Sequence, residues 1–114
     1  MGNLEALLTR LYEAYNRKDV DAVVAGMHPE IDWPSLFSEG RVVGREAVRA
    51  LLTRQFQTMD PEITPVAMTR DAQGRVRVRV NYVVRDLKGK LFTEEDNTNV
   101  FSFRDGLIVG MDWD

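Results

Sequence analysis

The C-terminal stretch Asn97–Asp114 constrains the fold more than any other part of the chain. Apolar and polar residues alternate on both sides of the turn Arg104–Gly106, which predicts two antiparallel strands, because successive side chains of a strand point to opposite faces. One face of this hairpin combines amides with large apolar side chains: Asn97, Asn99, Phe101, Phe103, Leu107, Val109, Met111 and Trp113. Such a mixture is typical of a small-molecule pocket and equally of an ordinary core.

The remaining elements precede this hairpin, with helices first and most strands later. Helical spacing of apolar residues predicts helices over Asn3–Arg17, Val20–Met27 and Arg45–Gln57, the second capped by Asp19. The predicted extended segments are Glu30–Pro34, Val42–Val43, Glu62–Asp71, Arg75–Asp86 and Leu91–Arg104. This order favours an α+β domain in which three N-terminal helices lie on one face of a curved antiparallel sheet.

The predicted strand Arg75–Asp86 alternates valines with arginines, which indicates one buried face and one solvated face. Within it, the alternation falters over Asn81–Val84 and predicts a β-bulge. The pattern leaves open whether Asn81 or Tyr82 faces the interior.

Composition bounds the class of protein. The chain of 114 residues has no cysteine and a net charge of −3, and we expect a single domain over residues 1–114. The missing cysteines exclude disulfides and thiol chemistry, and the slight acidity argues against nucleic acid as a partner. No apolar run approaches the roughly 20 residues of a membrane helix, and the first residues do not resemble a signal peptide. We therefore expect a cytoplasmic protein with no membrane partner.

Residues suited to acid or base chemistry are few: Asp32, Glu95, Asp96, Asp112 and His28. Strand alternation puts Asp32 and Asp112 outside if Trp33 and Trp113 face inward. Glu95 has the same parity as Asn97 and could reach a cavity mouth, although its acidic neighbours equally indicate a solvated strand. The single histidine, His28, reads either as a base or as a residue ending a helix before proline. No spacing of these groups predicts a metal site.

Three runs resemble the SnoaL-like branch of the nuclear transport factor 2-like superfamily: LYEAYNRKDVDAVVAGMHPEIDW, GRVVGREAVRALL and VFSFRDGLIVGMDW. The resemblance covers nearly the whole chain. It implies a cone, in which a strongly bent sheet wraps the helices and encloses an apolar cavity. Members of this superfamily include polyketide cyclases, ketosteroid isomerases, epoxide hydrolases and non-catalytic transport scaffolds, so the resemblance specifies the fold and leaves the function open.

The catalytic residues of these relatives are largely absent at the matching positions. The isomerases' helix tyrosine, base and oxyanion donor fall on Leu11, Ser35 and Asn99, and only Asn99 retains a suitable hydrogen-bond donor. An aspartate of the epoxide hydrolases falls on Trp113. Relatives with histidine at Asn81 and Asn99 use a titratable group that this chain lacks.

We therefore predict a domain that binds a small apolar or carbonyl-containing molecule without a cofactor or metal. The predicted ligand-contacting residues are Tyr15, Trp33, Asn81, Asn97, Asn99, Phe101, Met111 and Trp113. If the domain is catalytic, the chemistry is isomerase- or cyclase-like, with Asn99, Asp32 and Glu95 as candidate residues. The alternative is a non-catalytic interaction domain. In either case we expect a homodimer, because an apolar outer sheet face needs cover.

Overall fold

The computed structural model describes residues 3–35 and 40–114. Residues 36–39, part of the loop expected between the predicted segments Glu30–Pro34 and Val42–Val43, lie outside the described residues. Three helices and six strands follow the predicted order. They are α1 (Asn3–Asn16), α2 (Val20–Ala25), β1 (Met27–Pro34), β2 (Arg41–Val43), α3 (Arg45–Thr58), β3 (Asp60–Arg70), β4 (Val76–Arg85), β5 (Leu91–Arg104) and β6 (Leu107–Trp113). None of the helices in these described ranges is long and apolar enough to cross a membrane.

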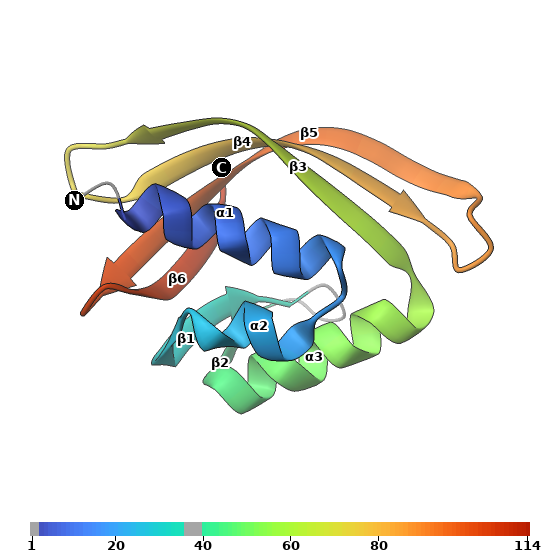
Figure 1. The fold of residues 1–114 in the computed structure, drawn as a ribbon, viewed down its shortest axis with the longest axis horizontal. Coiled ribbons are helices and arrows are strands. Elements are labelled where there is room, and N and C mark those ends of the chain that lie inside the picture. Colours follow the sequence, from blue (N-terminus) through green and yellow to red (C-terminus); the bar gives the residue numbers. More distant parts are fainter. Residues whose placement is uncertain (1–2, 36–39) are drawn as a thin grey trace.

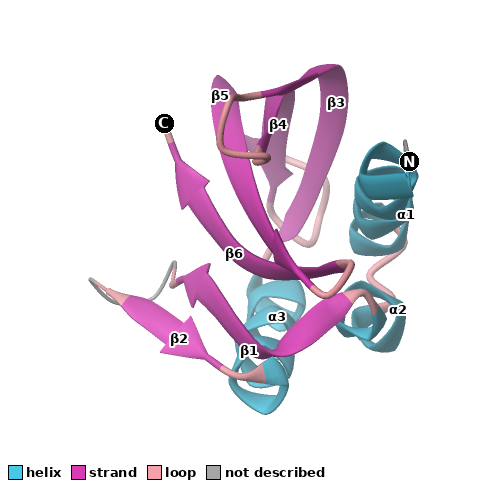
Figure 2. Ribbon diagram, turned by 90° about the vertical axis from the view of Figure 1, so that its left-hand side faces the viewer, coloured by secondary structure: helices cyan, strands magenta, loops and turns pink. Residues whose placement is uncertain are grey.

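The strands form one sheet in the order β2-β1-β6-β5-β4-β3, and the three helices lie on its concave side (Figures 1 and 2). Strands β3 to β6 pair with one another in antiparallel fashion, as predicted. Strand β1, however, runs parallel to β6, so the sheet is mixed and mostly antiparallel. No hairpin turn joins β1 to β6, and tertiary packing alone sets their relative direction.

Irregular pairing in several strands accompanies the bend of the sheet. The register shifts between neighbouring strands leave Val66 of β3, Phe92 of β5 and Val109 of β6 as the extra residues. Such bulges bend and twist a strand locally. The bulge predicted at Asn81–Val84 is wrong, because β4 keeps regular alternation there and the irregularities lie in its neighbours.

The bulge at Val109 also corrects the predicted inner face of β6. Met111 lies inside as predicted, but Ile108 is fully buried, whereas Leu107 and Val109 are only partly buried. An extra residue between two pairs reverses the alternation on one side of it. The turn before β6 is confirmed, since Asp105 and Gly106 have φ of 55° and 77°, the left-handed pair that favours a tight hairpin.

The N-terminal helices are close to their predicted bounds. The predicted cap of α2 is confirmed, because Asp19 Oδ1 accepts a hydrogen bond from the Ala22 N–H at 3.2 Å. The helix ends at Ala25, earlier than predicted, and Met27 and His28 belong to β1. His28 is therefore a strand residue and does not end a helix.

Candidate functional site

A largely apolar cavity of about 70 Å³ lies between α1, α3 and the concave face of the sheet. Residues from both helices and from five strands line it: Leu11, Tyr12, Tyr15, Trp33, Pro34, Gln55, Ile63, Val80, Tyr82, Asn97, Asn99, Phe101, Met111 and Trp113. Trp113 is 53% exposed, and Tyr82 and Asn97 are partly exposed, which puts the mouth of the cavity beside these three residues.

A buried pair of polar side chains, Tyr12 and Asn99, forms one wall. Asn99 Nδ2 donates a hydrogen bond to the Tyr12 hydroxyl oxygen at 3.0 Å, although α1 and β5 lie far apart in the sequence. Burial raises the pKa of Tyr12 well above its ordinary value, and the bond from Asn99 opposes this only in part. The hydroxyl oxygen already accepts this bond, so its proton is free to be donated to a ligand.

A second polar group approaches the cavity from α3. Gln55 Nε2 donates to the Tyr15 hydroxyl oxygen at 2.6 Å, and both side chains are buried. Burial is the main cause that raises the pKa values of Tyr15 and Tyr82, and a hydrogen bond with Tyr15 lowers that of Tyr82 in part. The three residues thus form a chain of neutral polar groups from α3 toward the cavity mouth.

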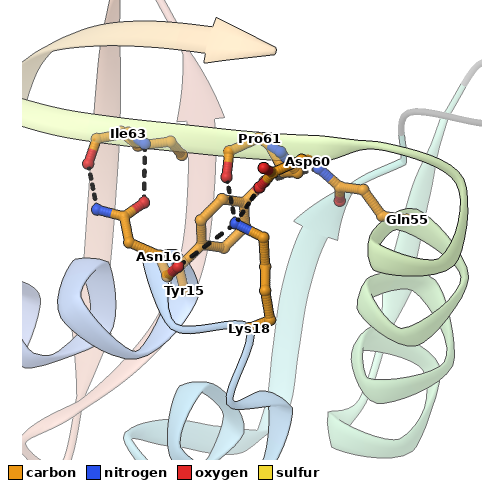
Figure 3. A network of polar contacts seen from close by, with 7 residues as sticks. All are labelled: Tyr15, Asn16, Lys18, Gln55, Asp60, Pro61 and Ile63. Atoms are coloured by element: carbon orange, nitrogen blue, oxygen red, sulfur yellow. Dashed lines mark hydrogen bonds and ion pairs between the residues drawn. The ribbon is translucent and has the colours of Figure 1, made fainter. Parts of the chain in front are cut away.

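Polar contacts connect the C-terminal end of α1 to β3 beside the cavity (Figure 3). Asn16 pairs with Ile63 as a neighbouring strand would: its Nδ2 donates to the Ile63 carbonyl, and its Oδ1 accepts the Ile63 N–H, both at 2.8 Å. Lys18 Nζ donates to the Pro61 carbonyl at 2.6 Å and lies 2.9 Å from Asp60 Oδ1. These contacts hold the Ile63 wall of the cavity against the helix.

Most of the predicted ligand-contacting residues line the cavity: Tyr15, Trp33, Asn97, Asn99, Phe101, Met111 and Trp113. Their contact with a ligand stays a prediction. The prediction that Asn81 contacts the ligand is wrong, because the residue lies on the convex face of the sheet. There its amide donates hydrogen bonds to Glu94 at 3.2 Å and to Asp96 at 3.1 Å. Regular alternation in β4 gives the inward position to Tyr82.

The carboxylates proposed as catalytic candidates lie outside the cavity. Asp32 is on the convex face, and Arg41 holds it together with Asp112 through contacts of 2.5 and 2.9 Å. Both carboxylates thus face outward as predicted, which removes Asp32 as a cavity acid. Glu95 is opposite Tyr82 in the β4–β5 register, but it is exposed and does not line the cavity.

The remaining titratable candidate, His28, is buried away from the cavity lining. Its Nδ1 accepts the Glu30 N–H at 3.0 Å, and its Nε2 lies 3.6 Å from Asp105 Oδ2. Ser35, which matches the isomerase base position, does not line the cavity either. Over residues 3–35 and 40–114, no group of three or more acidic or histidine side chains is arranged to hold a metal ion.

The predicted ligand-contacting set left out several lining residues, of which Tyr12, Gln55 and Tyr82 carry polar groups, and Tyr82 was the open alternative to Asn81. A signal existed for two of them. Tyr12 belongs to the apolar stripe of α1, and Gln55 occupies the buried side of α3 one turn after Leu51. A tyrosine or glutamine on a buried helix face needs a polar partner, which points to a buried polar network.

Comparison with known proteins agrees with this architecture. The SnoaL-like domain family matches residues 8–111. No curated protein matches the chain. Among solved structures, the fold is similar to that of a candidate polyketide cyclase from Xanthomonas campestris pv. campestris, with 22% identity, a TM-score of 0.82 and coverage of 96% of this chain and 87% of that chain.

Some of the similar structures contain bound molecules. TerC, co-crystallised with polyporic acid, has 19% identity, a TM-score of 0.83 and coverage of 97% of this chain and 89% of that chain. A Mycobacterium tuberculosis protein in complex with estradiol-17β-hemisuccinate has 14% identity, a TM-score of 0.82 and coverage of 95% and 89%. At these identities the structures demonstrate a shared fold, and the family match covers most of the sequence. The chain therefore belongs to the SnoaL-like domain family and has the nuclear transport factor 2-like fold.

Proposed function

We propose that this domain binds a small, largely apolar molecule that carries a carbonyl or similar acceptor oxygen. The observation that carries the proposal is the buried Asn99–Tyr12 pair, which leaves one hydroxyl proton available inside a largely apolar cavity. A neutral donor in such surroundings favours an uncharged acceptor, because an ion would lose its hydration without a counter-charge.

In this arrangement the ligand oxygen accepts the Tyr12 hydroxyl proton, and Phe101, Trp33 and Met111 contact the apolar part. The Tyr12 and Phe101 rings already meet edge to face with centroids 6.1 Å apart. The cavity of about 70 Å³ suits a small ligand. Two similar structures hold polyporic acid and estradiol-17β-hemisuccinate, which supports a ligand with apolar rings and carbonyl groups.

The lining residues favour binding over base catalysis. Their titratable members are Tyr12, Tyr15 and Tyr82, whose raised pKa values keep them protonated near neutral pH. Protonated tyrosines polarise a carbonyl but do not abstract a proton from carbon. Any isomerase- or cyclase-like activity would thus be limited to stabilising an enolate-like oxygen through Tyr12 and Asn99.

A matched pair of ligands tests the proposal. Acetophenone and ethylbenzene share a ring and differ in the acceptor oxygen, so calorimetric titration isolates the hydrogen bond. We expect about fivefold tighter binding of acetophenone, because one hydrogen bond contributes about 1 kcal/mol. Tyr12→Phe should reduce this preference to near unity. Equal affinity of the wild type for both compounds would contradict the proposal.

The two asparagines supply the control substitution. Asn99→Leu should abolish acetophenone binding while circular dichroism shows a folded domain. Asn81→Leu makes the same change on the convex face and should leave binding unchanged. If Asn99→Leu unfolds the protein, Asn99 is a structural residue and Tyr12→Phe decides the question.

We also propose a homodimer, although the original reason for it does not hold. The convex face is not apolar, since Arg77, Arg79 and Asn81 occupy it. Instead, Leu91 and Phe92 at the far end of the sheet are 50% and 79% exposed and offer an apolar contact. Light scattering should give twice the chain mass, and Phe92→Glu should halve it. A wild-type monomer would exclude the dimer.

A further inference from the structure

A second hollow, of about 480 Å³, lies on the other side of α1, between α1, α2 and the start of β6. We refer to it as the helix groove. Its lining combines an apolar floor with charged residues at the rim: Leu7, Arg10, Leu11, Glu13, Ala14, Arg17, Ala22, Val23, Ala25, Gly26, Leu107 and Ile108. Leu11 is the one described residue that lines both the helix groove and the inner cavity.

The geometry of α1 explains this double contact. Successive residues of a helix are rotated by roughly 100°, so Tyr12 and Tyr15 lie to one side of Leu11. Leu7 and Ala14 lie to its other side. The first two line the cavity and the last two line the helix groove, with Leu11 on the boundary between them.

We infer that Leu11 is the partition that limits how deep a ligand can enter, and thereby selects short ligands over long ones. This inference rests on the proposed ligand-binding function. The Leu11 side chain is 5% exposed although it borders two hollows, so it fills the space through which they would otherwise connect. Its truncation should let the ligand's far end pass under α1 into the helix groove.

The lining of the helix groove also indicates which longer ligand would bind more tightly once Leu11 is truncated. A chain that passes Leu11 meets the apolar side chains of Leu7 and Ala14. At the rim it then meets two exposed arginines and one carboxylate, Arg10, Arg17 and Glu13, and Arg17 lies 3.7 Å from Asp19. An alkyl chain ending in a carboxylate fits this sequence of surroundings, because the apolar part is buried and the charge meets guanidinium groups in water.

The test compares acetophenone with 4-hexylacetophenone by calorimetric titration. We expect the wild type to prefer acetophenone by about tenfold or more, and Leu11→Ala to reverse this preference. Leu8→Ala is the matched control, since Leu8 is fully buried in the same helix and lines neither hollow. It should weaken the fold and keep the wild-type preference. If Leu11→Ala does not fold, Leu11→Val should shift the preference in the same direction by a smaller factor.

The second probe is acetophenone substituted at position 4 with a six-carbon chain that ends in a carboxylate. It tests whether the bound chain reaches the rim of the helix groove. In the Leu11→Ala background it should bind several-fold tighter than the methyl-terminated chain, and Arg10→Gln with Arg17→Gln should remove that gain. The inference is overturned if Leu11→Ala leaves the preference for acetophenone unchanged. It is also overturned if the tighter binding of the carboxylate persists after both arginines are replaced.

A crystal structure of Leu11→Ala decides the partition without any ligand. We expect one continuous passage from the inner cavity to the helix groove. If neighbouring side chains close the gap, the inference is wrong, whatever the ligands do. If the wild type binds neither ketone while the passage opens, the proposed function fails and Leu11 is still the partition.

Discussion

The two faces of the curved sheet differ in charge although the same strands build both. On the concave face, β4 and β5 present Val80, Tyr82, Asn99 and Phe101 to the cavity. On the convex face, the alternate positions carry ions and their partners, among them Arg77, Arg79, Asn81 and Glu94, with Asp32 and Asp112 held by Arg41 nearby. A shift of one residue along a strand separates these environments.

This difference shows that the cavity excludes full charges while retaining polar groups. Burying an unpaired ion costs far more than burying an amide or a hydroxyl that has a hydrogen-bond partner. In the described part of the chain, no buried side-chain nitrogen or oxygen lacks such a partner. Carboxylates and guanidinium groups stay outside, and the cavity offers neutral donors to a neutral ligand.

The largest expected effect concerns the concave face. Phe101 is 1% exposed and contacts the Tyr12 and Trp33 rings, so Phe101→Ala should cost about 3–5 kcal/mol in the free energy of unfolding, measured by urea denaturation. Val66→Ala, in β3 and 62% exposed, should cost no more than about 0.5 kcal/mol. Equal losses would mean that the cavity wall carries no more packing than an exposed edge strand.

Alkaline pH tests the neutrality of the concave face. All three tyrosines of the chain have pKa values raised above the ordinary 10.0. Above pH 10 the unfolded chain loses these protons first, so stability is retained below that pH and falls as pH rises beyond it. Tyrosinate absorbance should therefore increase in one step together with the loss of circular dichroism. A separate ionisation of the folded protein near pH 10 would contradict the burial of these hydroxyls.

A smaller effect is expected on the convex face. Asp112→Asn removes one of the carboxylates at Arg41, whose side chain lies 2.9 Å from it, and both groups are partly solvated. Exposed ion pairs contribute about 0–1 kcal/mol, so the melting temperature should change little and acetophenone affinity not at all. A marked loss of binding would show that the two faces are coupled.

The smallest effect concerns an ion pair at the surface, between Glu5 and Arg70. Hydrogen bonds of 2.8 Å from Arg70 lower the pKa of Glu5 from 4.5 to about 2. The pair stabilises the fold above pH 4.5, and this contribution is lost as pH falls toward 2. Arg70→Gln should make the melting temperature depend less on pH in that window. An unchanged acid profile would show that solvent screens the pair completely.

Local signals in the sequence predicted much of the fold. The bounds of Leu91–Arg104, the cap at Asp19 and the turn at Asp105 and Gly106 depend on residues close in the chain, and the structure confirms them. The shared face of Asn99 and Phe101 followed from alternation within one strand. Such features need no knowledge of distant partners, because backbone geometry and burial decide them.

Only the tertiary structure decided how these pieces combine. The parallel pairing of β1 with β6, the bulge at Val109 and the position of Leu11 between two hollows depend on partners far away in the sequence. The same holds for the C-terminal hairpin, Asn97–Asp114. Its sequence supplied Asn99 for the cavity wall, but the hydrogen bond to Tyr12 arises because the sheet bends around α1 and brings the two side chains together.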